Sequence, residues 1–346
     1  DLAAAVVKAV VERADVDPAT IEDVILGNAT PEGEQGLLMG RLVALRAGLP
    51  KVVGGATINR WCGSSMSAIH YAAGQIAMGA GDAFVAAGVE SMTRVPMGGF
   101  NPMPNAELMQ DVYGVYMGMG ETAENVAERY QMTRESQEAF AVESHKKAAA
   151  AQAAGHFKDE IVTVDGVDAD GCIRPDTTVE GLSGLKPAFS ATGTVTAGTS
   201  SPLTDGAAAT LVCSAEYARE HNLTPLAVIK SMAINGCDPD VMGLGPIGAT
   251  RKALKRAGLE MGDIDIVEIN EAFASQSMAC INDLGMDISR VNLDGGAIAL
   301  GHPLGATGAR ITGKAAALLK REGKKYALST QCIGGGQGIT TIMEAA

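Results

Sequence analysis

Short apolar runs alternate with longer stretches of helical period along most of the chain. The apolar runs predict strands at residues 23–28, 56–60, 82–90, 207–213, 225–233, 265–270, 325–332 and 338–343. The other stretches predict helices at residues 1–14, 34–48, 121–130, 134–153, 246–258 and 304–320, and helices that begin at Ser64 and Glu271. Alternating strands and helices are typical of an α/β protein with a mostly parallel sheet.

Two parts of the chain carry nearly the same pattern. Residues 13–28 parallel residues 256–270, and both stretches lie between helices. Residues 94–118 and 156–202 lack clear periodicity, and long irregular insertions in a compact protein usually serve binding or oligomer contacts. We therefore predict two similar α/β halves with a site between them. The predicted units are residues 1–93 with 203–224, an inserted loop domain at 94–202, and residues 225–346.

The amino-acid composition argues against several kinds of partner and site. Lys and Arg number 27 and Asp and Glu number 40, a net charge of −13 that disfavours nucleic acid and anionic membranes as partners. No apolar run is long enough to cross a membrane. The six cysteines are far apart and form no CxxC pair or Cys/His cluster with zinc spacing, so we expect no metal and a reducing compartment. The chain opens inside a helical pattern at Asp1, and we expect natural sequence upstream of it.

Cys62 lies in the most informative stretch of the first half. A strand ends near Arg60 and a helix of small residues begins at Ser64, so Cys62 stands at the junction. The positive end of the helix dipole favours a thiolate there, and Gly63 lets a substrate or another backbone approach. The arrangement resembles a nucleophile elbow with sulfur in place of oxygen. A buried structural cysteine is the alternative.

The second half supplies three further motifs. Asn270 ends a strand, either as a site residue or as a helix N-cap. His302 lies between glycines and before Pro303, in a loop that opens a helix. Cys332 precedes three glycines, a turn that can direct several backbone N–H groups at one oxyanion. Two thiols and one histidine suit an acyl transfer in which one thiolate attacks a carbonyl and the second thiol moves a proton. A metal-bound His/Cys site is the rival interpretation.

Together these motifs resemble the thiolase family of acyl-CoA acetyltransferases and 3-ketoacyl-CoA thiolases. The resemblance rests on AsnArgTrpCysGlySerSer at 59–65, AsnGluAlaPhe at 270–273, GlyHisProLeuGlyAlaThrGlyAlaArg at 301–310 and CysIleGlyGlyGlyGlnGly at 332–338. It also includes residues 196–208 and extends over essentially the whole chain. It implies a duplicated five-layered α-β-α-β-α sandwich with a loop domain inserted in the first half.

The resemblance also implies a role for each matching residue. Cys62 would be the acylated nucleophile, His302 would activate it, and Cys332 would be the acid and base that protonates the leaving acetyl-CoA carbanion and deprotonates incoming CoA. Asn270 would hold a water at the first oxyanion, and the backbone N–H groups of Cys62 and Gly334 would form the second oxyanion hole. Coenzyme A, a substrate and not a resident cofactor, would contact Met119, Ala188, Phe189, Ala197, Gly198, Ser201, Met242, Ala272 and Phe273.

Several alternatives stay open within this resemblance. The leading expectation is thiolytic cleavage of 3-ketoacyl-CoA in fatty-acid β-oxidation, and the first alternative is a biosynthetic acetoacetyl-CoA thiolase. Gly118 favours a broader chain length, because some acetoacetyl-CoA-type enzymes carry a histidine at that position. Cys332 argues against a condensing enzyme of the ketoacyl-synthase type, and the intact chemical groups argue against an inactive CoA-binding scaffold. We expect a homodimer or homotetramer, a possible partner in a β-oxidation complex, and the bacterial cytoplasm or an organelle matrix.

Overall fold

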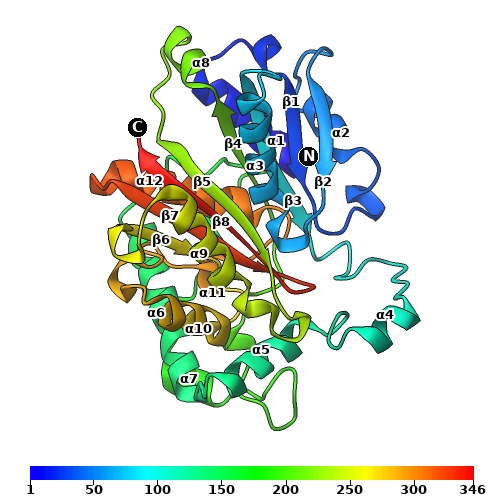
Figure 1. Ribbon diagram of the computed structural model, residues 1–346, viewed down its shortest axis with the longest axis vertical. Helices are drawn as coiled ribbons and strands as arrows, with labels where there is room; N and C mark the ends of the chain where they lie inside the picture. The colour runs from blue at the N-terminus through cyan, green and yellow to red at the C-terminus, as the bar shows by residue number, and fades with distance from the viewer.

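Two four-stranded sheets form the framework of the protein. The computed structural model describes all residues, 1–346. The first sheet has the order β2-β1-β3-β4 and the second β5-β8-β7-β6 (Figure 1). The strands are β1 (Asp23–Gly27), β2 (Gly54–Ile58), β3 (Ala83–Ser91), β4 (Asp205–Cys213), β5 (Ala227–Gly236), β6 (Ile266–Ile269), β7 (Tyr326–Ile333) and β8 (Gln337–Ala345).

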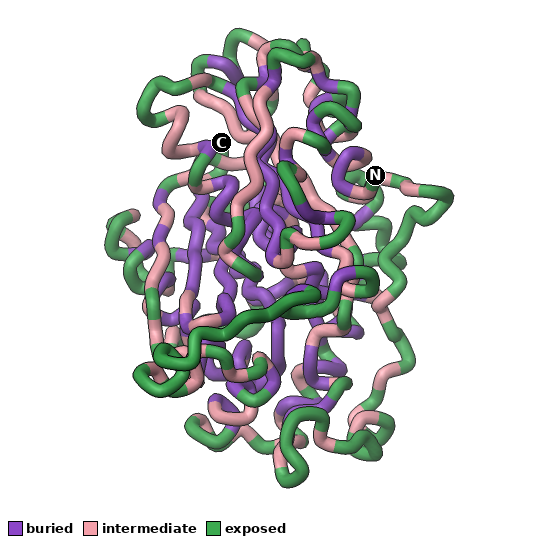
Figure 2. Tube along the Cα trace, turned by 90° about the vertical axis from the view of Figure 1, so that its right-hand side faces the viewer, coloured by how far each residue is buried: buried purple, intermediate pink, exposed green.

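Helices separate and cover the two sheets. Helices α1 (Leu2–Ala14) and α2 (Met39–Arg46) pack on the outer face of the first sheet, and α9 (Gly245–Ala257) packs on the outer face of the second. Between the sheets, α3 (Ser64–Ala77) lies against α12 (Thr307–Glu322). This order of layers confirms the predicted α-β-α-β-α sandwich. Figure 2 shows the buried chain concentrated along this central region.

The two halves repeat one strand pattern, which confirms the predicted duplication. Strands β1 and β3 run parallel with Gly27 opposite Gly88, and β6 and β7 run parallel with Ile269 opposite Thr330. The next strand is antiparallel in both halves, β4 beside β3 and β8 beside β7. The halves differ at the far edge, where β8 also pairs with β5 while β4 has no second neighbour.

Small side chains allow these layers to approach closely. A Cβ added to Gly308 in the first turn of α12 would lie 2.2 Å from the backbone nitrogen of Met66 in α3. The largest apolar cluster has 18 buried residues and joins α1 and α2 to the first sheet, and a second of 13 residues lies in the second half. Alanine and glycine therefore set the spacing of the middle layer, on which the site depends.

The segment between β3 and β4 adds a helical layer to the second half. Its helices are α4 (Ala106–Asp111), α5 (Met119–Arg129), α6 (Arg134–Ala153) and α7 (Val179–Ser183). Helices α5 and α6 pack against α10 (Ala274–Leu284), and α6 also contacts α11 (Ala297–Leu300). Helix α4 lies apart, on an arm at the right of Figure 1. The hydroxyl of Thr133 accepts a hydrogen bond from the backbone N–H of Ser136 and so caps α6.

Three predicted helices begin later than expected, and one of them, predicted to begin at Glu271, begins at Ala274 as α10. Residues 33–35 form a 3-10 turn, and Leu37 has a φ of 59°, so the helix predicted at 34–48 is confined to α2. The helix predicted to begin at residue 304 begins at Thr307, because the backbone before it lies across strand ends of the first sheet. One further helix, α8 (Ala215–Glu220), follows β4. None of the helices combines the length and the apolar character needed to cross a membrane.

Candidate active site

Cys62 lies at the junction of β2 and α3, as predicted. It belongs to a 3-10 turn, Trp61–Gly63, and its side chain is buried. Its own backbone N–H and that of Gly334 are placed to donate to the sulfur, which favours the thiolate. Burial outweighs them and raises the pKa of the Cys62 thiol to about 11, with a smaller contribution from the charge of Glu90. The expected thiolate is therefore not the resting state, because desolvation exceeds the effect of the helix start.

His302 lies in the loop between α11 and α12, and its neighbours fix its tautomer. The Thr307 hydroxyl donates to the carbonyl oxygen of Pro303 at 2.9 Å, so it accepts from Nδ1–H of His302 at 2.6 Å. The lone pair of the ring is then on Nε2, 3.3 Å from Nδ2 of Asn270. Burial, with the nearby charge of Arg310, lowers the pKa of His302 to about 3. The imidazole is neutral and can accept a proton at Nε2.

Two amide oxygens near this histidine lack protein partners. Asn270 follows β6, and its Oδ1 is buried without a hydrogen bond. Gln331, in β7, donates through Nε2 to the carbonyl oxygen of Cys62, and its Oε1 is likewise unpartnered. A buried acceptor without a partner is costly, so each oxygen suits a water or a substrate donor.

Cys332 is fully buried near the end of β7. Burial raises the pKa of its thiol well above the ordinary value, and the charge of Cys62 raises it further. The preceding residue, Gln331, contacts the backbone of Cys62. Gly335 and Gly336 have φ values of 78° and 83°, a backbone region that favours glycine and that shapes the turn to β8. At Gly334 an added Cβ would lie 2.2 Å from Cε3 of Trp61. A side chain at residue 334 would therefore displace Trp61, next to the nucleophile.

The residues expected to contact CoA also lie together. Met242, Ala272 and Phe273 form an apolar cluster with Cys332, and Met119 packs against it. The Phe189 ring meets Phe273 edge to face at 5.9 Å between centroids. The remaining members are close to the same wall. The Ser201 N–H donates to the Ala272 carbonyl at 3.0 Å, Ala197 and Gly198 belong to the turn Ala197–Thr199, and the Ala188 N–H donates to the Val195 carbonyl at 2.9 Å.

The sequence motifs overlooked four residues that hold this site. Thr307 orients the His302 ring, and the Thr204 hydroxyl accepts from the His302 backbone N–H at 3.1 Å. Gln331 holds the Cys62 carbonyl, and Glu90 contacts the loop after His302. Thr307 lies within the histidine motif and Gln331 directly precedes the cysteine motif, which is a usable signal. Thr204 and Glu90 are distant in sequence from every residue that they help to place.

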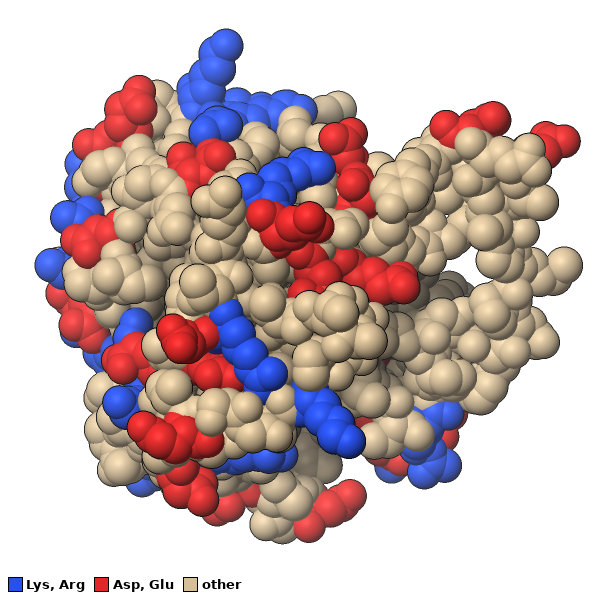
Figure 3. Space-filling model, turned by 90° about the horizontal axis from the view of Figure 1, so that it is seen from below, with Lys and Arg blue, Asp and Glu red and all other residues tan.

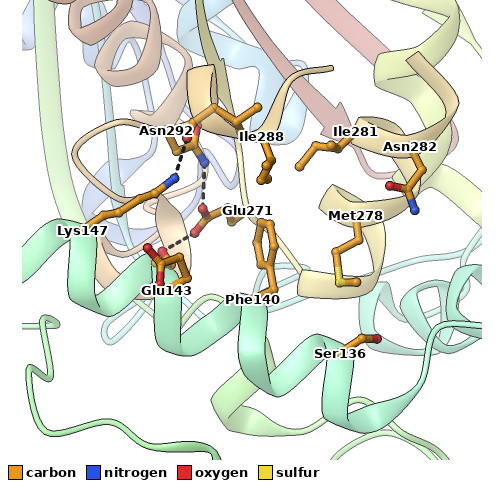
Figure 4. A pocket seen from close by; sticks show the side chains of 12 residues that line it. Ser136, Phe140, Glu143, Lys147, Glu271, Met278, Ile281, Asn282, Ile288 and Asn292 are labelled. Atoms are coloured by element: carbon orange, nitrogen blue, oxygen red, sulfur yellow. Dashed lines mark hydrogen bonds between the residues drawn. The ribbon is translucent and has the colours of Figure 1, made fainter. Parts of the chain in front are cut away.

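A separate cavity of about 340 Å³ lies between α6 and α10 (Figure 4). Phe140, Met278 and Ile281 contribute apolar walls, and Lys147 donates to the Val291 carbonyl at 2.9 Å. Glu271 forms part of the wall, where it accepts from Ser144 and Asn292. None of the predicted site residues lines this cavity. No group of three or more His, Cys, Asp or Glu side chains is arranged to hold a metal ion.

Comparison with known proteins agrees with this geometry. The sequence matches the family "Thiolase, N-terminal domain" over residues 1–216 and "Thiolase, C-terminal domain" over residues 223–345. The chain belongs to the thiolase family. Thiolases with curated descriptions are similar over nearly its whole length. A 3-ketoacyl-CoA thiolase of Bacillus subtilis is 47% identical over 99% of this chain and 92% of the relative, and one of Idiomarina loihiensis is 49% identical over the same shares.

Solved thiolase structures have the same fold. The crystal structure of human mitochondrial 3-ketoacyl-CoA thiolase in complex with CoA matches with a TM-score of 0.92 and 39% identity. The match extends over 100% of this chain and 92% of that thiolase. The duplicated sandwich is therefore the thiolase fold, and its two halves together supply the candidate residues.

Proposed function

We propose that this thiolase cleaves 3-ketoacyl-CoA with coenzyme A, to give acetyl-CoA and an acyl-CoA shortened by two carbons. The proposal rests on two buried pairs: Cys62 and Cys332, linked by the hydrogen bond from Gln331 to the Cys62 carbonyl, and His302 and Asn270, which are hydrogen-bonded to each other. The identity of 47–49% to 3-ketoacyl-CoA thiolases supports the same reaction. As an acyltransferase of this kind, the protein would act in fatty-acid β-oxidation.

The first half-reaction forms an acyl enzyme. Nε2 of His302 takes the proton of Cys62 as the sulfur attacks the 3-keto carbon, because both groups are neutral before substrate arrives. The backbone N–H groups of Cys62 and Gly334 stabilise the oxyanion that forms. The bond between C2 and C3 then breaks, and the thiol of Cys332 protonates C2 of the leaving acetyl-CoA. Asn270, through a water, and His302 stabilise the enolate oxygen of that leaving group.

The second half-reaction returns the enzyme to its resting state. The Cys332 thiolate takes the proton of incoming CoA, and the CoA sulfur attacks the acyl group on Cys62. The Cys62 thiolate leaves and recovers its proton from His302. The apolar cluster of Met242, Ala272 and Phe273, with Met119, suits the pantetheine arm beside these thiols, and Ala188, Phe189, Ala197, Gly198 and Ser201 would complete the CoA site.

A biosynthetic acetoacetyl-CoA thiolase would use the same residues in the opposite direction. The decisive measurement compares CoA-dependent thiolysis of acetoacetyl-CoA and of a C10 3-ketoacyl-CoA. We expect comparable or faster turnover on the longer substrate, whereas activity confined to acetoacetyl-CoA would identify the biosynthetic enzyme. Cys62→Ser is the catalytic variant, and Cys213→Ser, at the end of β4, is its matched control. Equal activity of Cys62→Ser and Cys213→Ser would overturn the catalytic assignment.

We also propose that the protein is a homo-oligomer, and that the arm of residues 94–118 contributes to the contact. The arm exposes Met97, Phe100, Met103, Met109 and Tyr113, and Met103 is 92% exposed. Figure 3 shows a projecting part at the right with charge only near its tip, in contrast to the mixed charges elsewhere. Exposed apolar surface of this kind is typical of an interface.

Light scattering during size exclusion tests the oligomer. We expect a dimeric or tetrameric mass for the wild type and a smaller mass for Met103→Glu with Met109→Glu. Val167→Glu, at another exposed apolar position, should leave the mass unchanged. A wild-type monomer would contradict the proposal. The similarity to bacterial thiolases favours a cytoplasmic location. A partner in a β-oxidation complex would be recovered with the protein in a pull-down from bacterial cells.

A further inference from the structure

The duplicated fold gives the active site a counterpart in the other half. Gly27 and Ile269 occupy equivalent places beside Gly88 and Thr330, so the residues two positions further along β3 and β7 are also equivalent. Those residues are Glu90 and Cys332. Likewise, Cys62 stands two residues before α3, and Gly305 stands two residues before α12. Glu90 therefore corresponds to Cys332, and Gly305 corresponds to Cys62. The site with the two thiols has as its counterpart a site formed by Glu90 and Gly305.

Glu90 fills the position that corresponds to Cys332, and both of its carboxylate oxygens accept hydrogen bonds. Its side chain is 1% exposed, and Oε2 accepts from the backbone N–H of Ala29 at 2.8 Å and of Gly305 at 2.9 Å. Oε1 accepts from Gln35 Nε2 at 2.6 Å and from the Thr30 N–H at 3.2 Å. One carboxylate thus satisfies donors from both halves of the molecule.

The loop after His302 fits against Glu90 with no spare room. A Cβ on Gly305 would lie 2.6 Å from the Val89 carbonyl oxygen, and a Cβ on Gly88 would lie 2.1 Å from the Gly305 carbonyl oxygen. Pro303 packs against Gly206, the β4 partner of Glu90. Residues 303–305 are therefore held on both sides by strands of the nucleophile half. Only two residues separate Gly305 from His302.

We propose that Glu90 is a positioning residue, which fixes His302 relative to Cys62 by anchoring the loop at Gly305 to the first sheet. Beside this anchor, the His302 loop has polar contacts with Thr204, Thr307 and Asn270. Thr307 belongs to α12 and Asn270 to the second half, whereas Thr204, directly before β4, also belongs to the nucleophile half, so Glu90 and Thr204 together tie the loop to that half. Cys62 follows β2 of the first sheet, so a shift of residues 303–305 relative to that sheet would move His302 relative to Cys62.

Glu90→Gln tests this role. The amide has nearly the volume of the carboxylate, but its NH₂ group replaces one of the two acceptor oxygens. Because Gln35 and Gly305 donate to different oxygens of Glu90, the variant can keep only one of these two hydrogen bonds. We expect kcat for thiolysis to fall roughly 10- to 100-fold, with the KM values for CoA and 3-ketoacyl-CoA within about two-fold of wild type. Misplacement of a catalytic base changes the chemical step and leaves substrate binding nearly intact.

A matched control separates positioning from folding. Glu138→Gln also neutralises a buried carboxylate, one that pairs with Arg134 in α6 and makes no hydrogen bond to a candidate catalytic residue. We expect this control to lower the melting temperature with kcat retained. If Glu90→Gln does not fold, Glu90→Asp retains the charge with a shorter reach, and the same split between kcat and KM is expected with a smaller fall. Wild-type kcat in a folded Glu90 variant, or an equal fall in Glu138→Gln, would overturn the proposal.

Discussion

The two halves of this thiolase place different chemistry at equivalent points. Near the end of β7 the second half carries the fully buried Cys332, whose neighbour Gln331 donates to the Cys62 carbonyl. At the equivalent point of β3 the first half carries Glu90, whose oxygens are occupied by N–H donors from both halves. A duplicated framework thus yields one reactive junction and one structural junction. The reactive junction carries a buried thiol, whereas the structural junction carries a carboxylate whose two oxygens both accept hydrogen bonds.

The asparagines at equivalent strand ends test this contrast most strongly. Asn270 follows β6 and contacts His302, whereas Asn28 follows β1 and donates to the Val89 carbonyl at 3.0 Å. We expect Asn270→Ala to lower kcat roughly 100- to 1,000-fold, the usual cost of removing an oxyanion-stabilising group. Steady-state thiolysis, with circular dichroism to verify folding, measures it.

Asn28→Ala is the matched control for that experiment. It removes a buried hydrogen bond and should cost about 1–3 kcal/mol of unfolding free energy. We expect its kcat to stay well within ten-fold of wild type. Similar losses of kcat in both variants would mean that the two junctions contribute alike to catalysis and that the contrast between them is false.

The close packing of the middle helices gives the second prediction. Gly308→Ala would place a methyl group against the backbone of Met66, and neither backbone can move without separating α3 from α12. We expect a loss of about 2–3 kcal/mol in urea unfolding, since overpacking a tight contact costs this order of free energy. An unchanged urea midpoint would show that the two halves pack less rigidly than their spacing indicates.

The buried histidines of the two halves give the third prediction. Burial lowers the pKa of His70 in α3 to about 3, as it does for His302. Each histidine takes up a proton near pH 6.5 in the unfolded chain but not in the folded chain. Its contribution to the free energy of unfolding is therefore full above pH 6.5 and decreases as the pH falls toward 3. His70→Asn should reduce the loss of stability between pH 7 and pH 5 by about 1–2 kcal/mol.

Urea unfolding at pH 7 and at pH 5 measures this effect. The rate of thiolysis then distinguishes the roles of the two histidines. His302→Asn should reduce the acid sensitivity in the same way and also abolish thiolysis, whereas His70→Asn should retain kcat. His70 contacts Thr341 at 2.8 Å, a bond that asparagine can preserve. Unaltered acid sensitivity in His70→Asn would mean that this histidine is protonated in the folded protein.

The glycine of α3, Gly74, gives the smallest expected effect. A Cβ on Gly74 would meet nothing within 4 Å, in contrast to Gly308 in α12. Gly74→Ala should therefore stabilise the protein by about 0.5–1 kcal/mol, because alanine restricts the unfolded chain and favours the helix. Thermal melting detects the rise, and a fall in melting temperature would place an unseen neighbour on this face of α3.

The sequence by itself determined the elements, the repeat and the reactive groups. Apolar runs and helical periods predicted the strands and main helices to within a few residues, because these patterns depend on local spacing. The similarity of residues 13–28 and 256–270 predicted the duplication. Glycine-rich turns at strand and helix ends identified Cys62, His302 and Cys332 as chemical candidates.

Only the tertiary structure decided how those groups behave. The contacts between Cys62 and Gly334 and between Glu90 and Gly305 join residues more than 200 positions apart, so no local pattern contains them. The protonation state of Cys62 followed from burial, which overcame the helix start that the sequence suggested. The His302 tautomer followed from Thr307 and Pro303. Local sequence sets propensity and chemistry, whereas burial and long-range hydrogen bonds exist only once the two halves have packed.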